Sequence, residues 1–239
     1  MKKIKIPSDL TSLAYNSIKE HILEGHLDQD SRLTESLLSD QLGISRSPIR
    51  EALNSLATEG LITIEPRRGA FLRRFSVKEV SDLYELRKLL EGFAVQTAEI
   101  TPKFLTGLDK SIERSTALLN SNKKREFIEE DMWFHGAIAT ATGNQPLFVT
   151  LENVQNQIWL CRCKTYNLSS SSAPENHRSI VEALRENDRR KAKIAMREHI
   201  EYVQQRLVAF LSAHPAASES EPGNGNRRRH LVSGPEAIV

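Results

Sequence analysis

Four side chains in the second half of the sequence have the types and surroundings of metal ligands. Asp131 and His135 lie four residues apart in the segment EEDMWFHGAIATATGN, so on a helix their side chains project next to each other. His177 and His199 have apolar neighbours at helical spacings, which predicts that each lies on the inward face of its own helix. A buried carboxylate needs a partner. One divalent cation satisfies all four groups, and imidazole with carboxylate suits Zn²⁺, Ni²⁺ or Mn²⁺.

A single histidine on an apolar face is more often a hydrogen-bonded core residue than a metal ligand. Three of the seven histidines on inward faces, with one inward carboxylate, leave the two interpretations evenly balanced. Three histidines and one aspartate fill a tetrahedral site, whereas hydrolytic zinc sites usually keep an open position. Glu129 and Glu130 are expected on the outward face, so no obvious general base stands beside the cluster. The pattern favours ligand binding over catalysis.

Arg87 is a candidate for binding an anion near this cluster. In LYELRKLLEGFA it lies on or beside the apolar face of its helix, and a guanidinium can hold a carboxylate through two hydrogen bonds. The alternative is an arginine at the rim, paired with Glu91 four residues later. Asn153, Asn156 and Gln157 are further candidates for the lining of an effector pocket.

The elements that must position these side chains are helices. Ser76 and Glu79 form a predicted capping box, and Pro102 marks the start of the next helix. A loop rich in serine precedes a long helix or a helix pair from about 175 to 212. Since no strand pattern appears from 76 onward, we expect an all-α antiparallel bundle of six or seven helices over 76–213.

The first part of the chain has a different pattern. In TESLLSDQLGISRSPIREALNSLATEGLITIEPRRGAFLRRF, a short apolar helix is followed by Gly43, which permits a tight turn, and by a second helix with Pro48 in its first turn. LITIEP and AFLRRF read as two strands around a turn. The pattern predicts a winged helix-turn-helix, so the fold class is mainly α, with this domain at 8–75 ahead of the bundle.

The side chains of this domain suit DNA. Arginines at the start of a recognition helix can contact guanine, serines can contact phosphates, and a helix N-terminus favours anions. Isolated arginines are usually solvated surface charges, but here the serines, the turn, the helix and the wing agree. The predicted DNA-binding residues are Ser45, Arg46, Ser47 and Arg50 at the second helix and Arg67, Arg68 and Gly69 at the wing.

The motifs ISRSPIREAL, EGLI and RRGAF resemble those of the GntR family of transcription regulators, and the helical part is similar to the FCD domain of its FadR-type subfamily. The resemblance covers about 8–212. It implies that Arg46, Arg50 and Gly69 match positions that contact DNA. Ser36 departs from the pattern, because some relatives carry an arginine there that touches the operator, which leaves the operator sequence open.

The resemblance also bears on the helical domain. Metal-binding FCD domains use one aspartate and three histidines, in motifs that match DMWFH, ENHRSIVEAL and MREHI here. In related domains an arginine in the motif around Arg87 holds the carboxylate of the effector. The residues implied as metal ligands are Asp131, His135, His177 and His199.

The charge and composition of the whole chain limit its possible functions and location further. Its 239 residues carry a net charge of only +2, so any contact with nucleic acid depends on local patches. The N-terminus has no apolar segment typical of a secretory leader, and no apolar run is long enough to cross a bilayer. Cys161 and Cys163 are interpreted as ordinary helix residues. Residues 214–239 are rich in Pro, Gly, Ser and Glu and are expected to be disordered.

We therefore expect a cytoplasmic, nucleoid-associated homodimer that binds a palindromic operator in double-stranded DNA and is not an enzyme. A small organic acid would bind in a metal-containing helical pocket and modulate operator binding, most commonly by releasing a repressor. Two alternatives remain open. One is a metal-dependent enzyme fused to a DNA-binding head, and the other is a regulator whose metal is structural or is itself the signal.

Overall fold

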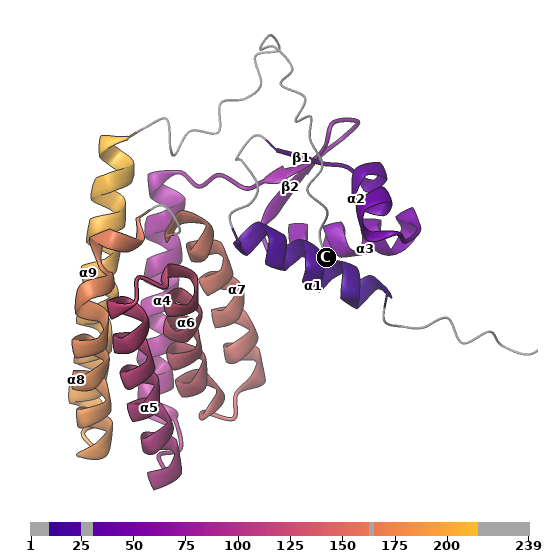
Figure 1. Ribbon diagram of the computed structural model, residues 1–239. Coiled ribbons are helices and arrows are strands. Elements are labelled where there is room, and N and C mark those ends of the chain that lie inside the picture. Colours follow the sequence, from indigo (N-terminus) through magenta and orange to yellow (C-terminus); the bar gives the residue numbers. More distant parts are fainter. Residues whose placement is uncertain (1–9, 25–30, 163–164, 215–239) are drawn as a thin grey trace, which may run out of the picture.

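The computed structural model describes residues 10–24, 31–162 and 165–214, which form a small N-terminal head and a helical bundle (Figure 1). The head comprises α1 (Leu10–Leu23), β1 (Arg32–Leu33), α2 (Glu35–Leu42), α3 (Arg46–Thr58), β2 (Ile62–Glu65) and β3 (Gly69–Leu72). The bundle comprises α4 (Val77–Thr97), α5 (Pro102–Asn120), α6 (Lys124–Thr140), α7 (Gln145–Arg162), α8 (Ala173–Arg185) and α9 (Arg189–Ala213). The predicted fold class is confirmed.

The helix-turn-helix is formed by α2 and α3. The Thr34 hydroxyl caps α2 by accepting a hydrogen bond from the backbone N–H of Leu37. Gly43 follows with φ 65°, a left-handed conformation that a β-carbon disfavours, and this residue turns the chain into α3. Helix α1 packs against α3, and Ile18 and Ile49 are buried in their shared core. The predicted turn thus lies between the two predicted helices.

The wing has one strand more than the sequence predicts. Strands β2 and β3 pair antiparallel, and the two-residue strand β1 pairs with the other edge of β3, in the order β1-β3-β2. Gly69 has φ 106°, and a β-carbon there would lie 3.0 Å from the backbone oxygen of Leu33 on β1. Glycine is therefore needed at this position both for the turn and for the close approach of β1.

Six helices form the bundle, and their ends follow the predicted signals. Ser76 and Glu79 make the capping box at the start of α4. Pro102 is the first residue of α5, whose first turn is also capped by the Thr101 hydroxyl. Between α7 and α8 the chain makes two short 3₁₀ turns, η1 (Tyr166–Leu168) and η2 (Ser170–Ser172). The long C-terminal segment is a helix pair, α8 and α9, rather than one helix.

Helix α7 joins the bundle to the head. The Gln157 side-chain amide donates a hydrogen bond of 2.9 Å to the backbone oxygen of Glu59, which follows α3. Arg125 on α6 pairs with Glu20 and Glu24 at the end of α1. Figure 1 shows α1 and α7 as neighbouring helices where the two units meet.

Two sequence predictions concern residues beyond this description. The predicted disordered tail, apart from His214, and Cys163 lie outside the described residues. Across the ranges that are described, none of the helices combines the length and the apolar character that crossing a membrane requires.

Candidate metal centre and DNA-binding surface

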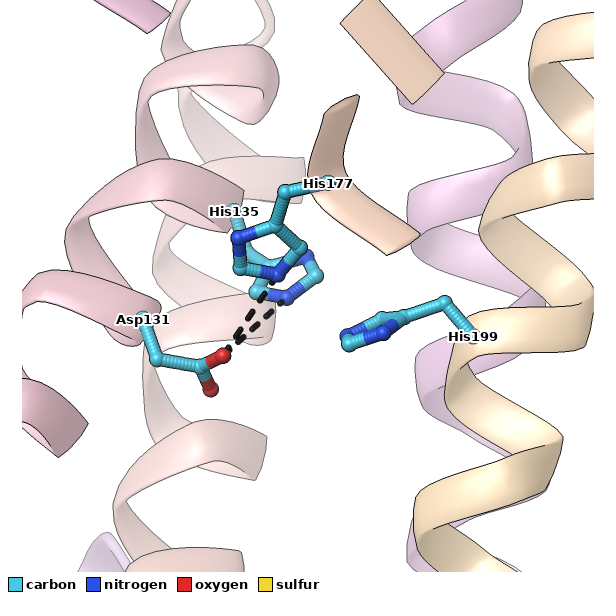
Figure 2. A group of neighbouring side chains, drawn as sticks. All are labelled: Asp131, His135, His177 and His199. Atoms are coloured by element: carbon cyan, nitrogen blue, oxygen red, sulfur yellow. Dashed lines mark ion pairs between the residues drawn. The ribbon is translucent and has the colours of Figure 1, made fainter. Parts of the chain in front are cut away.

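The four predicted metal ligands converge in the interior of the bundle (Figure 2). Asp131 and His135 come from α6, His177 from α8 and His199 from α9. None is more than 3% exposed, and one ligand atom from each lies within 4.8 Å of the others. The Asp131 Oδ1 atom is 3.5 Å from the Nε2 atom of His177 and 4.0 Å from that of His135. Three helices that are distant in sequence therefore bring one carboxylate and three imidazoles together.

The imidazole rings are held by their surroundings. The ring of Phe134 stacks on that of His177, with centroids 3.9 Å apart and an interplanar angle of 2°. On the far side of His135, its Nδ1 atom lies against the Glu91 carboxylate. A contact of this kind orients an imidazole and leaves the opposite nitrogen available to a metal.

Several polar atoms of the cluster lack a hydrogen-bond partner. They are Asp131 Oδ1, His135 Nε2 and both ring nitrogens of His177 and His199. Buried polar atoms are nearly always hydrogen-bonded, because the lost hydration is unfavourable. A divalent cation with three imidazole nitrogens and one carboxylate oxygen accounts for one such atom on each of the four residues. The donor set therefore fits a metal ion.

The protonation states also suit a metal. Burial, reinforced by the neighbouring imidazoles, lowers the pKa of His177 to about 3 and holds the pKa of His199 well below its usual value. Burial opposes ionisation of Asp131, but Arg162 and the histidines outweigh it and hold the Asp131 pKa well below its usual value. His177 and His199 thus present neutral imidazoles and Asp131 an ionised carboxylate, the forms that bind metals.

Two further residues contact the predicted ligands: Arg162, which the sequence interpretation missed, and Glu91, which it named only as a partner of Arg87 at the rim. Glu91 is 1% exposed and accepts a hydrogen bond of 2.5 Å from the Arg87 Nε atom. Burial would raise the pKa of Glu91, but Arg87 and His135 lower it to about 2. Arg162 donates a hydrogen bond of 2.6 Å to Asp131 Oδ2. The expected pair of Arg87 and Glu91 therefore exists, but it is buried beside the cluster and not at the rim.

A small cavity of about 10 Å³ adjoins the cluster. It offers room for about one water molecule. Its polar lining consists of Arg87, Asp131 and Arg162 together with Gln155, and Ile128, Met132, Ile158 and Trp159 complete the wall.

The three amides predicted on α7 lie elsewhere. Asn153 and Asn156 do not line the cavity, and Gln157 is bonded to the head. The positions of α7 that line the cavity, 155, 158, 159 and 162, follow helical spacing. Asn156 is nevertheless buried and its Nδ2 atom has no hydrogen-bond partner, so effector binding by Asn153 and Asn156 stays a prediction.

The predicted DNA-binding residues form two exposed groups on the head. Ser45, Arg46, Ser47 and Arg50 are exposed at the start of α3, and Arg67 and Arg68 are exposed at the wing turn beside the half-buried Gly69. The Ser45 hydroxyl makes no capping hydrogen bond to α3.

Two arginines of the α3 group are held by side chains of α2. Arg50 makes two hydrogen bonds of 2.7 Å to the carboxylate of Glu35. Arg46 donates one of 3.2 Å to the hydroxyl of Ser36. A bidentate carboxylate occupies the same donors that a guanine would take, so the predicted base contact of Arg50 would require it to exchange its partner.

A winged helix-turn-helix attached to a helical domain with a buried ligand cluster defines a class, the DNA-binding transcriptional regulators with a sensor domain. Comparison with known families agrees. Residues 10–72 match the family "Bacterial regulatory proteins, gntR family", and residues 82–202 match the FCD domain. The chain belongs to the GntR family of bacterial transcriptional regulators and carries an FCD domain.

Individual relatives support this assignment. The chain is 29% identical over 205 residues to YdhC, an uncharacterized HTH-type transcriptional regulator of Bacillus subtilis (strain 168), covering 84% of this chain and 92% of that protein. It is 26% identical over 218 residues to the gluconate operon transcriptional repressor of the same organism, covering 87% and 89%. The solved structure of E. coli McbR/YncC has the same fold, with a TM-score of 0.75 and 22% identity over 84% of this chain and 98% of that one.

The family sets the general function. These proteins are transcriptional regulators and not enzymes, they bind DNA operators, and some relatives are repressors. FCD domains bind small-molecule effectors and are associated with metal binding. The buried Asp/His cluster of this chain could hold such a metal.

Proposed function

We propose that the chain is a repressor whose operator binding is controlled by a small organic acid bound beside a divalent metal in the helical bundle. The observation that carries this proposal is the position of the four-ligand cluster, one member of which, Asp131, lines a cavity together with Arg87 and Arg162. Zn²⁺, Ni²⁺ or Mn²⁺ would be held by Asp131 and the three histidines. When bound, the metal would supply a positive charge and, if octahedral, open positions for a carboxylate.

The buried charges support an anionic effector. Without metal, the carboxylates of Asp131 and Glu91 offset the guanidiniums of Arg87 and Arg162, and burial favours the neutral forms of His177 and His199. A divalent cation adds two positive charges that no buried side chain balances. Uncompensated charge in a protein interior is strongly unfavourable, so an anion entering this cavity offsets it. Arg162 and Arg87 present guanidinium groups suited to a carboxylate.

One observation favours a second candidate, a structural metal. The cavity has room for about one water molecule, so the closed structure leaves little space for an effector. In that case the metal would hold α6, α8 and α9 together, or would itself be the signal. These possibilities are separated by measuring whether an organic acid binds to the metal-free protein and whether the metal binds in the absence of any acid.

The head would bind DNA through α3 and the wing. We propose that Arg46 and Arg50 contact base edges in the major groove, and that Ser45 and Ser47 contact phosphates. Arg67 and Arg68 would contact the DNA backbone from the wing, where Gly69 permits the turn. The exposure of these side chains at the start of α3 and at the wing turn supports this orientation.

We also propose a homodimer, in the cytoplasm at the nucleoid, on a palindromic operator. Leu86, Leu89 and Phe93 lie on one stripe of α4 and are 39%, 73% and 48% exposed. Ile194, 49% exposed, extends the apolar surface onto the neighbouring α9. An apolar stripe of this kind is typical of a subunit interface. DNA binding would belong to residues 8–75 and effector binding to 76–213.

The test is a titration of metal-free protein with Zn²⁺, Ni²⁺ and Mn²⁺, followed by short carboxylates such as acetate, with operator affinity measured at each step. The proposal expects about one metal per chain and a change in operator affinity that requires both metal and carboxylate. A change produced by metal alone, with no further effect of any carboxylate, would support the metal as the signal.

A further inference from the structure

A second and larger space lies next to the metal cavity. It is a groove of about 740 Å³ between α5, α6 and α7. Aromatic side chains from all three helices line it, namely Phe104, Trp133 and Phe148. The volume falls within the range of about 300–1,000 Å³ that is common for small-molecule sites. The groove is therefore large enough for an organic ligand, whereas the cavity beside the metal ligands is not.

Two helical glycines leave this groove open. Gly107 on α5 and Gly136 on α6 both line it, and neither has a positive φ. A β-carbon on Gly107 would meet only Trp133, at 4.0 Å, and one on Gly136 would meet only Phe148, at 3.6 Å. Glycine inside a helix destabilises it by about 1 kcal/mol relative to alanine. Because neither the backbone nor a close neighbour requires glycine here, its effect is to keep space free.

The inner end of the groove reaches the metal cavity. Met132 and Gln155 line both spaces, so their side chains form the partition between them. Gln155 is 6% exposed, and its Nε2 donor has no hydrogen-bond partner. An unpartnered buried amide between an apolar groove and a cavity lined by two arginines is suited to donate to a ligand that passes from one to the other.

We propose that the groove binds the apolar part of the effector, which is a monocarboxylic acid with an aromatic or medium-length aliphatic group. Its carboxylate lies at the Gln155 amide, beside Arg87 and Arg162, and its apolar part lies between Trp133 and Phe148. Rotation of the flexible Met132 side chain joins the two spaces. This inference rests on the proposed function, since it assigns the ligand class of the same site. The apolar stripe on α4 and α9 is on other helices, so a second subunit does not need the groove.

The test measures the affinity of zinc-loaded protein for a series of acids: acetate, butyrate, hexanoate and octanoate. Binding can be followed by tryptophan fluorescence, because the only two tryptophans of the chain, Trp133 and Trp159, line the groove and the cavity. Affinity should rise about fourfold for each added methylene until the groove is full. Octanol should bind more weakly than octanoate, because it lacks the charge that the cavity recognises.

Variants separate the groove from the carboxylate site. Gly136→Leu should fill the groove, leave acetate affinity unchanged and abolish the gain with chain length. Gly107→Leu, on the opposite wall, should act in the same way and provides a second test if one variant does not fold. Thr150→Leu is the matched control, since Thr150 is exposed on α7 outside the groove lining and the variant should keep the full dependence on chain length.

Three results would overturn the inference. If acetate and octanoate bind equally well, the groove takes no part, although the proposed carboxylate site stands. If Gly136→Leu converts a dimer to a monomer without changing the affinity for any acid, the groove is a subunit interface. If no carboxylate of any length binds to metal-loaded protein, the proposed function and this inference both fail.

Discussion

The indole Nε1 of Trp159 donates a hydrogen bond of 3.0 Å to the backbone oxygen of Leu23. Trp159 lines the cavity beside Asp131 and Arg162, whereas Leu23 is the last residue of α1 in the DNA-binding head. One side chain therefore contacts both the candidate effector cavity and the head. Gln157, two residues earlier, bonds to the backbone after α3. A shift of α7 on effector binding would change both contacts, which supplies a physical route between the two sites.

Trp159→Phe should weaken the coupling between effector and operator. The variant keeps an aromatic wall but removes the donor, and one hydrogen bond contributes about 0.5–1.5 kcal/mol. We expect the ratio of operator affinities with and without acetate to shrink by up to roughly tenfold, while the operator affinity of the free protein changes little. Trp133→Phe is the control, because Trp133 makes no such bond to the head. A ratio unchanged by Trp159→Phe would exclude this route.

Removal of the metal should lower thermal stability. An ion present at about a thousand times its dissociation constant stabilises the folded state by about 4 kcal/mol, which corresponds to a melting temperature higher by roughly 10 °C. Elemental analysis should find about one divalent metal per chain, and His199→Ala should lose both the metal and the stabilisation. The exposed His214 offers a control, since His214→Gln should retain both. Metal-replete protein with no bound ion would exclude the site.

The sequence could predict the ligand cluster because each member has a local signal. Asp131 and His135 share a helical face by their spacing, and the apolar neighbours of His177 and His199 place those imidazoles inward. Which helices meet is not a local property. Arg162 is the last residue of α7, and its approach to Asp131 depends on how α6 packs against α7.

The features that the sequence did not predict all depend on packing between elements that are distant in the sequence. Strand β1 has only two residues, too few for a periodic pattern, and exists because β3 pairs with it. Glu91 follows Arg87 by four residues, a spacing equally typical of a surface pair, and only the packing of α4 against α6 and α9 buries both. Asn153 and Asn156 were predicted to line the effector pocket because they are polar residues of α7. The amide of α7 that lines the cavity is that of Gln155, because the orientation of the helix directs this side chain to it.

Arg50→Ala should lose operator binding and remain folded. Loss of a bidentate base contact costs about 1–3 kcal/mol, or roughly 5- to 150-fold in affinity. Arg50 is exposed and its pair with Glu35 is at the surface, so the melting temperature should change little. Arg178→Ala on α8, which also breaks an exposed pair, is the matched control and should bind the operator normally. Wild-type affinity should fall steeply with salt, because phosphate contacts release counterions. Normal binding by Arg50→Ala would refute the assignment of α3 as the recognition helix.

Metal-free protein should lose stability as the pH falls below about 6.5. An unfolded histidine has a pKa near 6.5, whereas the folded pKa of His177 is about 3 and that of His199 is also well below its usual value. Between these values the unfolded chain binds protons that the folded chain does not, so acid favours unfolding, by up to about 1.4 kcal/mol per pH unit for each group. Asp131 and Glu91, whose pKa values are lowered, act in the same direction only in more acidic solution. Urea unfolding from pH 7.5 to pH 5 measures the slope. His199→Met should make it shallower and His214→Gln should not, and a slope that His199→Met leaves unchanged would contradict the prediction.

Leu89→Glu should dissociate the proposed dimer. Leu89 is the most exposed member of the α4 stripe, at 73%, and a carboxylate at the centre of an apolar interface would be desolvated without a partner. In the monomer the side chain is solvated, so the fold and metal content should be unchanged. Light scattering should show the mass of one chain, and operator affinity should fall by more than tenfold, since a palindromic site is bound by two heads together. Val149→Glu is the control, because Val149 is an exposed apolar residue on α7 and lies outside the stripe. A Leu89→Glu protein that stays dimeric would place the subunit interface elsewhere on the bundle.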